Sequence, residues 1–212
     1  MKKLLIFAFV LLLAFSALAA EDSITYTIEN GVLTVSGSGV CEKLPLTDEQ
    51  WKTIERIVIT EGITEIGDWA FDGYLKQNKV YTSVTLPEGL TRIGYAAFAF
   101  AETLTDINLP STLTEIGYGA FNETAIKDIT IPSGVIKISD ALFNGSELES
   151  ITLPETLIEI GQFAFQHTKL DKIELPPSLK IIGPSAFAHC YNLKKICLPE
   201  GVTKIHSFAF YE

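Results

Sequence analysis

A leucine-proline or isoleucine-proline pair recurs along the chain at nearly constant spacing. Six of the nine prolines lie in these pairs, and successive pairs are 22 or 23 residues apart. The pairs are Leu86-Pro87, Leu109-Pro110, Ile131-Pro132, Leu153-Pro154, Leu175-Pro176 and Leu198-Pro199. An earlier unit of 27 residues begins at Ile59-Thr60, and we expect its extra residues to form a loop at Leu75 to Asn78. A fixed period of this length is the signature of a solenoid, in which each unit packs on its neighbours.

Each unit repeats one order of residue types. Ile129-Thr130-Ile131 alternates in polarity, which predicts a half-buried strand that the following proline ends. A second extended piece such as Leu113 to Ile116 precedes a glycine, which we expect to permit a sharp reversal. A helical turn then carries an alanine and a phenylalanine inward. The phenylalanine column is Phe71, Phe98, Phe121, Phe143, Phe165, Phe187 and Phe210. The glycine column is Gly67, Gly94, Gly117, Gly161 and Gly183, interrupted by Ser139 and His206. The pattern predicts an α/β solenoid with a parallel sheet.

These units resemble the BspA-like (treponemal) class of leucine-rich repeat proteins. The resemblance is carried by L-x-x-I-x-L-P-x-x-L-x-x-I-G-x-x-A-F runs such as Leu148 to Phe165, and it extends from Trp51 to Glu212. It implies a leucine-rich repeat domain at 51–212 with about seven units, the last incomplete. It also implies a non-enzymatic binding scaffold that acts in adhesion to host proteins or other cells. The strands at Ile24 to Ile28 and Val32 to Gly37, joined by Asn30-Gly31, predict a β-hairpin cap within 20–50.

The first residues read as a signal for export. Lys2 and Lys3 precede an apolar run from Leu4 to Phe15, and Ala17-Leu18-Ala19 has the small residues of a cleavage site. We therefore expect a signal peptide at 1–19 and a secreted or cell-surface protein without stable membrane insertion after cleavage; a permanent membrane anchor is the alternative. Acidic residues outnumber basic ones by 26 to 16, a net charge of −10, so nucleic acid is excluded as a partner.

Outward strand positions bring charged residues into one column. Asp106 and Asp128 occupy this column in neighbouring units, and Lys172 and Lys195 give its other end positive charge. Neighbouring strands lie about 4.8 Å apart, so the two carboxylates are expected side by side, either as a solvated pair or around a calcium ion. A secreted enzyme that uses this carboxylate pair is the least favoured alternative, because a flat sheet offers no closed pocket. We predict no catalytic residue, no metal site and no cofactor.

An exposed aromatic cluster is the preferred contact site for an extracellular protein or glycan. Tyr95 and Tyr118 follow the column glycines of neighbouring units, and Trp69 lies near them. Amphipathic aromatic side chains are favoured at recognition surfaces. The alternative is that these rings pack over the alanine column.

The remaining histidines and cysteines give no clear site. His167 and His189 share a column and could pair around a metal, but no third ligand is evident, so we interpret them as surface residues. Cys41, Cys190 and Cys197 allow one disulfide, whose partners the sequence does not decide.

The last unit stops at Phe210-Tyr211-Glu212, without a closing strand. We expect Leu198, Val202, Ile205 and Phe210 to be less buried than their equivalents in middle units. This end would then fray or pack against a second copy as a homo-oligomer. A structural stub of a larger surface assembly is a further alternative.

Overall fold

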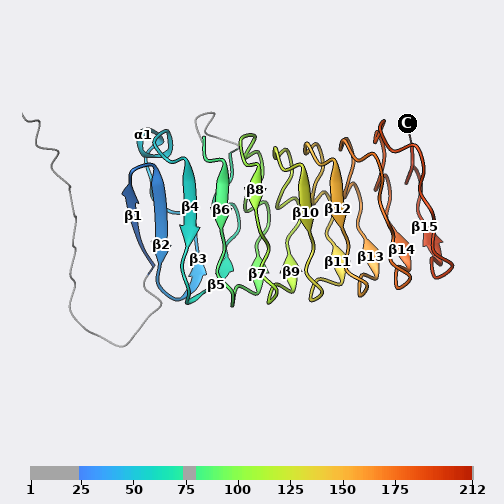
Figure 1. Ribbon diagram of the computed structural model, residues 1–212, viewed down its shortest axis with the longest axis horizontal. Coiled ribbons are helices and arrows are strands. Elements are labelled where there is room, and N and C mark those ends of the chain that lie inside the picture. Colours follow the sequence, from blue (N-terminus) through green and yellow to red (C-terminus); the bar gives the residue numbers. More distant parts are fainter. Residues whose placement is uncertain (1–23, 74–79, 212) are drawn as a thin grey trace, which may run out of the picture.

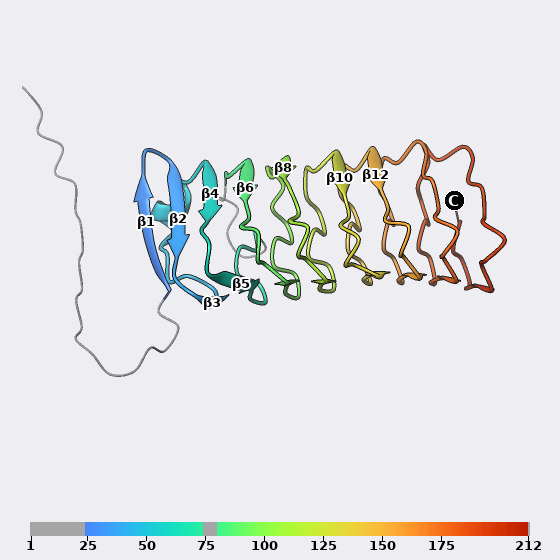
Figure 2. The ribbon, with the colours of Figure 1, turned by 60° about the horizontal axis from the view of Figure 1, so that its bottom comes forward.

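Two rows of short strands run along an elongated stack of turns in the computed structural model, which describes residues 24–73 and 80–211 (Figures 1 and 2). The expected signal peptide and the expected loop at Leu75 to Asn78 lie outside the described residues. The stack begins with β1 (Thr25–Glu29) and β2 (Val32–Ser36), which form an antiparallel hairpin. Asn30 and Gly31 both have positive φ, as a two-residue hairpin turn requires. β2 pairs in parallel with β4 (Arg56–Ile59), so the predicted hairpin covers the first turn.

The front row consists of one five-stranded sheet and one separate strand pair. The sheet has the order β1-β2-β4-β6-β8, and the pair is β10-β12. The added strands are β6 (Ser83–Thr85), β8 (Asp106–Ile107), β10 (Asp128–Thr130) and β12 (Ser150–Thr152). In Figure 1 these strands follow one another along the upper side of the stack.

The back row consists of two four-stranded parallel sheets. The first contains β3 (Gly39–Cys41), β5 (Ile63–Ile66), β7 (Arg92–Ile93) and β9 (Glu115–Ile116). The second contains β11 (Lys137–Ile138), β13 (Glu159–Ile160), β14 (Ile181–Ile182) and β15 (Lys204–Ile205). These strands form the lower row in Figure 1.

The phenylalanine column forms the predicted core between the two rows. Successive rings from Phe71 to Phe210 stack nearly parallel, with centroids 5.2 to 5.8 Å apart. Phe121 and Phe143 have no exposed surface. Buried hydroxyls such as that of Thr168 donate to the phenylalanine carbonyl three residues earlier, which closes the turn without leaving an unpaired polar group.

The α/β class is not confirmed, because the described residues contain very little helix. The one helix is α1 (Asp48–Trp51), a single turn that Thr47 and Gln50 cap reciprocally. In the repeats, the expected helical turns are irregular. Each complete unit contains residues with positive φ, such as Phe163 and His167. Because a residue in the left-handed conformation ends an α-helix, no regular helix forms in these turns. The fold is therefore a β-solenoid of about seven turns.

The glycine column has a different role from the one predicted. Gly117 does not have positive φ; instead, a Cβ there would lie 2.6 Å from the carbonyl carbon and 2.7 Å from the oxygen of Gly94. The amide of Gly117 donates to the Ile93 carbonyl at 2.8 Å. Glycine thus allows one turn to approach the backbone of the turn before it.

Both rows of strands are interrupted at one boundary, between the turns of Gly117 and Ser139, which we call the seam. Within the described chain, no strand pairing joins β8 to β10 or β9 to β11. Ser139 replaces the column glycine at this boundary, and its hydroxyl donates to the Ile116 carbonyl. The stack still continues across the seam, because the Phe121 amide donates to the Leu142 carbonyl at 3.0 Å. The predicted parallel sheet is therefore interrupted at this boundary, while the core continues.

The last turn is exposed, as the sequence predicts. Leu198, Ile205 and Phe210 are 46%, 45% and 37% exposed, whereas Ile160 and Phe165 have no exposed surface. Val202 is only partly buried. Among the residues that the structure describes, no helix is long and apolar enough to cross a membrane.

Candidate binding surfaces

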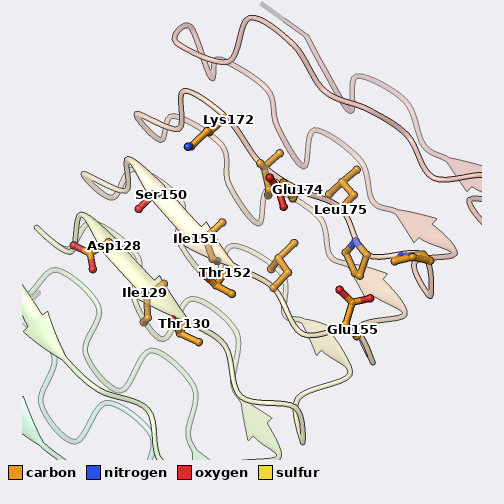
Figure 3. A pocket seen from close by; sticks show the side chains of 14 residues that line it. Asp128, Ile129, Thr130, Ser150, Ile151, Thr152, Glu155, Lys172, Glu174 and Leu175 are labelled. Carbon is orange, nitrogen blue, oxygen red and sulfur yellow. The ribbon is translucent and has the colours of Figure 1, made fainter.

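The front row displays a column of polar side chains in fixed register. Arg56 pairs with Ser83, and Ser83 pairs with Asp106. Beyond the seam, Asp128 pairs with Ser150. Figure 3 shows Asp128, Ser150 and Lys172 following one another along one side of the face. Thr130, Thr152 and Glu174 form a second line in the same view. The strand spacing therefore sets the distance between successive polar groups on this face.

Two hollows lie on the front row, one across the seam and one over the paired strands β10 and β12 and the turn that follows them. The first, of about 430 Å³, spans the seam and is lined by both Asp106 and Asp128. The two carboxylates line one hollow, although no described pairing joins their strands β8 and β10. The second, of about 540 Å³, contains Asp128, Lys172 and Glu174 (Figure 3). Lys195 is exposed but lines neither hollow.

Both hollows are surface features of the front row. They are open to solvent, and polar strand residues line them. In the part of the chain that the structure describes, no three His, Cys, Asp or Glu side chains are grouped to hold a metal ion. The arrangement offers hydrogen-bonding and charged groups to a partner that lies across the face.

Trp69, Tyr95 and Tyr118 form a second surface, which we call the aromatic ladder. The ring centroids of Trp69 and Tyr95 are 5.1 Å apart, and those of Tyr95 and Tyr118 are 5.0 Å apart. The backbone fixes this spacing, because the Trp69 amide donates to the Tyr95 carbonyl at 2.9 Å. The three side chains are 37%, 40% and 47% exposed. The rings are therefore accessible, and their role in binding stays a prediction.

A groove of about 240 Å³ runs beside the aromatic ladder and holds two asparagines that the sequence analysis missed. Asn144 Nδ2 donates to Asn122 Oδ1 at 2.9 Å. Asn144 Oδ1 is buried and accepts no hydrogen bond, a situation that costs about 1–3 kcal/mol. The sequence does contain a signal for this asparagine pair, because in two neighbouring units an asparagine directly follows the column phenylalanine.

His167 and His189 lie against each other, but among the described residues they are not part of a group that could hold a metal ion. The rings of His167 and His189 stack 4.6 Å apart, and His189 Nδ1 lies 2.9 Å from the Tyr191 hydroxyl. The stack places them at the surface, with His167 exposed and His189 partly buried.

The three cysteines are free thiols. Cys41 and Cys190 are buried, and Cys197 is exposed on the front side. Burial, with a smaller contribution from the negative charge of Glu42, raises the pKa of the Cys41 thiol to about 12. Burial also raises the pKa of Cys190, which keeps both thiols protonated at neutral pH.

Comparisons with known proteins agree with this architecture. A family described as "BspA type leucine rich repeat region" matches six copies, over residues 49–146 and 114–212. A leucine-rich cell surface protein from Faecalibacterium prausnitzii is 27% identical, with a TM-score of 0.62; the match covers 86% of this chain and 55% of that one. A leucine-rich repeat protein from Bacteroides ovatus is 26% identical, with a TM-score of 0.54 and coverage of 90% and 61%. The chain thus spans little more than half of either structure. No curated protein shows significant sequence similarity to it.

Proposed function

Because the chain belongs to the BspA-type leucine-rich repeat family, we propose that it is an exported, non-enzymatic scaffold that binds an extracellular protein partner at the cell surface. The observation that carries this proposal is the polar column of the front row. Its charge changes from acidic at Asp106 and Asp128 to basic at Lys172 and Lys195 along the stack. Such a face fits a protein that presents the opposite order of charges. The Faecalibacterium relative is described as a cell surface protein, which supports the proposed location.

Three features favour protein recognition over catalysis. All four charged side chains are exposed, so they can attract a partner before contact. The two hollows are shallow and open, so they suit side chains from an opposing surface better than an enclosed substrate. The stacked core holds the column on a rigid element, which lowers the entropic cost of ordering the face on binding.

The test is binding of the purified protein to immobilised extracellular-matrix proteins and to intact cells. The variant Asp106→Lys/Asp128→Lys is expected to lose about tenfold or more in affinity at low salt, because two charges of the column are reversed. The unmodified protein is expected to bind more weakly as salt rises. Its matched control, Glu49→Lys/Glu102→Lys, makes the same charge change at exposed positions outside the column. Equal binding by both variants, or binding to none of the targets, would contradict the proposal.

Exposed apolar residues on the last turn favour a second candidate role, assembly. Leu198, Ile205 and Phe208 are 46%, 45% and 67% exposed. We propose that this end packs against a second copy of the chain, which would cover these side chains. Sedimentation velocity over a wide concentration range tests the idea. A species that remains monomeric at all concentrations, and whose last turn resists proteolysis, would contradict it.

A further inference from the structure

The aromatic ladder ends at Tyr118 with one ring face uncovered. Tyr95 has a ring on each side, Trp69 at 5.1 Å and Tyr118 at 5.0 Å. In the next turn, the equivalent position is Asp140, and no described aromatic ring stacks on that side of Tyr118. Tyr118 is also the most exposed member of the ladder, at 47%. One further ring would fit the ladder at the spacing that the solenoid already imposes.

Small residues keep the space beside that ring face open. Ala96, Gly119 and Ala141 occupy one column of the groove, and all three have positive φ. Their conformation is held between turns, because the Gly119 amide donates to the Asp140 carbonyl at 3.0 Å. The groove continues past Tyr118 into the turn of Ala141 and Asn144. Its volume of about 240 Å³ suits one ring of a ligand rather than a whole side of a protein.

Polar groups surround this space on the side away from the ring. The amides of Asn122 and Asn144 line the groove, and Asn144 Oδ1 is an acceptor that no described group satisfies. Asp140 Oδ1 accepts a hydrogen bond from the Gln162 amide at 3.0 Å, which holds this carboxylate in place. A small rotation of the Asn144 side chain would allow its amide oxygen to accept a hydrogen bond from a ligand bound in the groove. The site therefore combines one apolar ring face with two side-chain amides that can accept hydrogen bonds from hydroxyl groups.

We propose that this groove binds a neutral pyranose sugar, which stacks on the free face of Tyr118 and donates hydroxyl hydrogen bonds to the amide oxygens of Asn122 and Asn144. A pyranose ring has an apolar C–H face and a polar rim, the combination that Tyr118 and these two side chains complement. The inference adds a glycan to the partners of the proposed binding scaffold and uses a surface separate from the polar column.

Charge decides between classes of sugar. Asp140 follows Tyr118 in the same column one turn later, Asp68 precedes Trp69 at the start of the aromatic ladder, and the chain carries a net charge of −10. An acidic sugar would meet these carboxylates without a described cation lining the groove. A purely aromatic ligand would stack equally well but would leave Asn144 Oδ1 without a donor. A neutral sugar satisfies both conditions.

The experiment is a binding assay of the full chain against immobilised oligosaccharides. One set ends in glucose, galactose, mannose or N-acetylglucosamine, and the other ends in glucuronic or N-acetylneuraminic acid. The unmodified protein is expected to bind members of the neutral set. Tyr118→Ala is expected to weaken binding about tenfold or more, and Tyr118→Phe to retain it, because only the first removes the ring. Tyr191→Ala removes another exposed tyrosine and serves as the matched control.

A second variant keeps the proposal falsifiable if Tyr118→Ala does not fold. Asp140→Tyr places a ring where the sugar is expected, in a column that already holds Tyr95 and Tyr118, and should abolish binding while the fold is kept. The proposal is overturned if no neutral sugar binds, if the acidic set binds equally well, or if Asp140→Tyr binds as the unmodified protein does. Asp106→Lys/Asp128→Lys is expected to retain sugar binding. Failure of this inference therefore differs in outcome from failure of the proposed protein recognition.

Discussion

The boundary between the turns of Gly94 and Gly117 differs from the seam that follows it. At the first boundary β7 pairs with β9, β6 pairs with β8, and the Gly117 amide donates to the Ile93 carbonyl. At the seam, neither pairing is present in the described chain, and a serine hydroxyl makes the bond to Ile116. The phenylalanine rings nevertheless stack 5.7 Å apart on both boundaries.

The difference teaches that two features hold the solenoid together independently. Backbone pairing is absent at the seam, where Ser139 replaces the column glycine, but it is retained at His206, where β14 still pairs with β15. The core depends on the phenylalanine column, which continues through the seam without change. The loss of strand pairing at the seam coincides with surface features, since the front hollow of Asp106 and Asp128 and the groove beside the aromatic ladder both cross it.

The largest expected effect concerns the core. Phe121→Ala removes a fully buried ring between Phe98 and Phe143 and should lower the free energy of unfolding by about 3–5 kcal/mol. Phe210→Ala, in the exposed last turn, should cost clearly less. Urea denaturation measures both. A loss below about 1 kcal/mol for Phe121→Ala would show that the column does not hold the turns together.

An intermediate effect is expected for the glycine column. Gly117→Ala forces a Cβ against the backbone of Gly94 and Tyr95 and should destabilise by about 1–3 kcal/mol. Ser139→Ala, the matched change at the seam, adds no Cβ and removes one hydrogen bond, so it should cost about 1 kcal/mol. Equal losses measured by thermal or urea unfolding would refute the role assigned to the glycines.

The smallest effect concerns the thiols in the first and last turns. Cys197 should react rapidly with a thiol reagent at pH 8, whereas the buried Cys41 and Cys190 should react only on unfolding. Because the pKa of Cys41 rises from 9.0 to about 12 on folding, the unfolded chain releases this proton first. Stability should therefore decline as pH rises from about 9 toward 12. Three rapidly reacting thiols would indicate that the first turn is open.

The sequence predicts whatever depends on the period alone. Phe121, Tyr95 and Tyr118 repeat at fixed spacing, so their stacking follows directly from the columns. The left-handed residues were not predictable, because Ala141 and His167 have no intrinsic preference for positive φ and are held by bonds between turns.

The loss of strand pairing at the seam could not be predicted from the sequence without the geometry of the turns. Ser139 is visible in the sequence as an interruption of the glycine column. The loss of strand pairing does not follow from that interruption alone, because His206 interrupts the same column and β14 still pairs with β15. The repeat period likewise predicts that Asp106 and Asp128 lie near each other, but only the structure shows that their strands are not paired.

Native-state hydrogen exchange at matched positions across the seam tests the account most directly. The amides of Ile158 and Gly161 donate to Ile136 and Ile138 at 2.8 Å, whereas no described bond to the preceding turn is made by the amides of Ile136 and Ser139. We predict that Ile136 and Ser139 exchange faster than Ile158 and Gly161. In Ser139→Gly, the exchange at these positions should slow toward that of Gly161. Equal protection on both sides in the unmodified protein would contradict the claim that strand pairing is lost at the seam while the phenylalanine core continues through it.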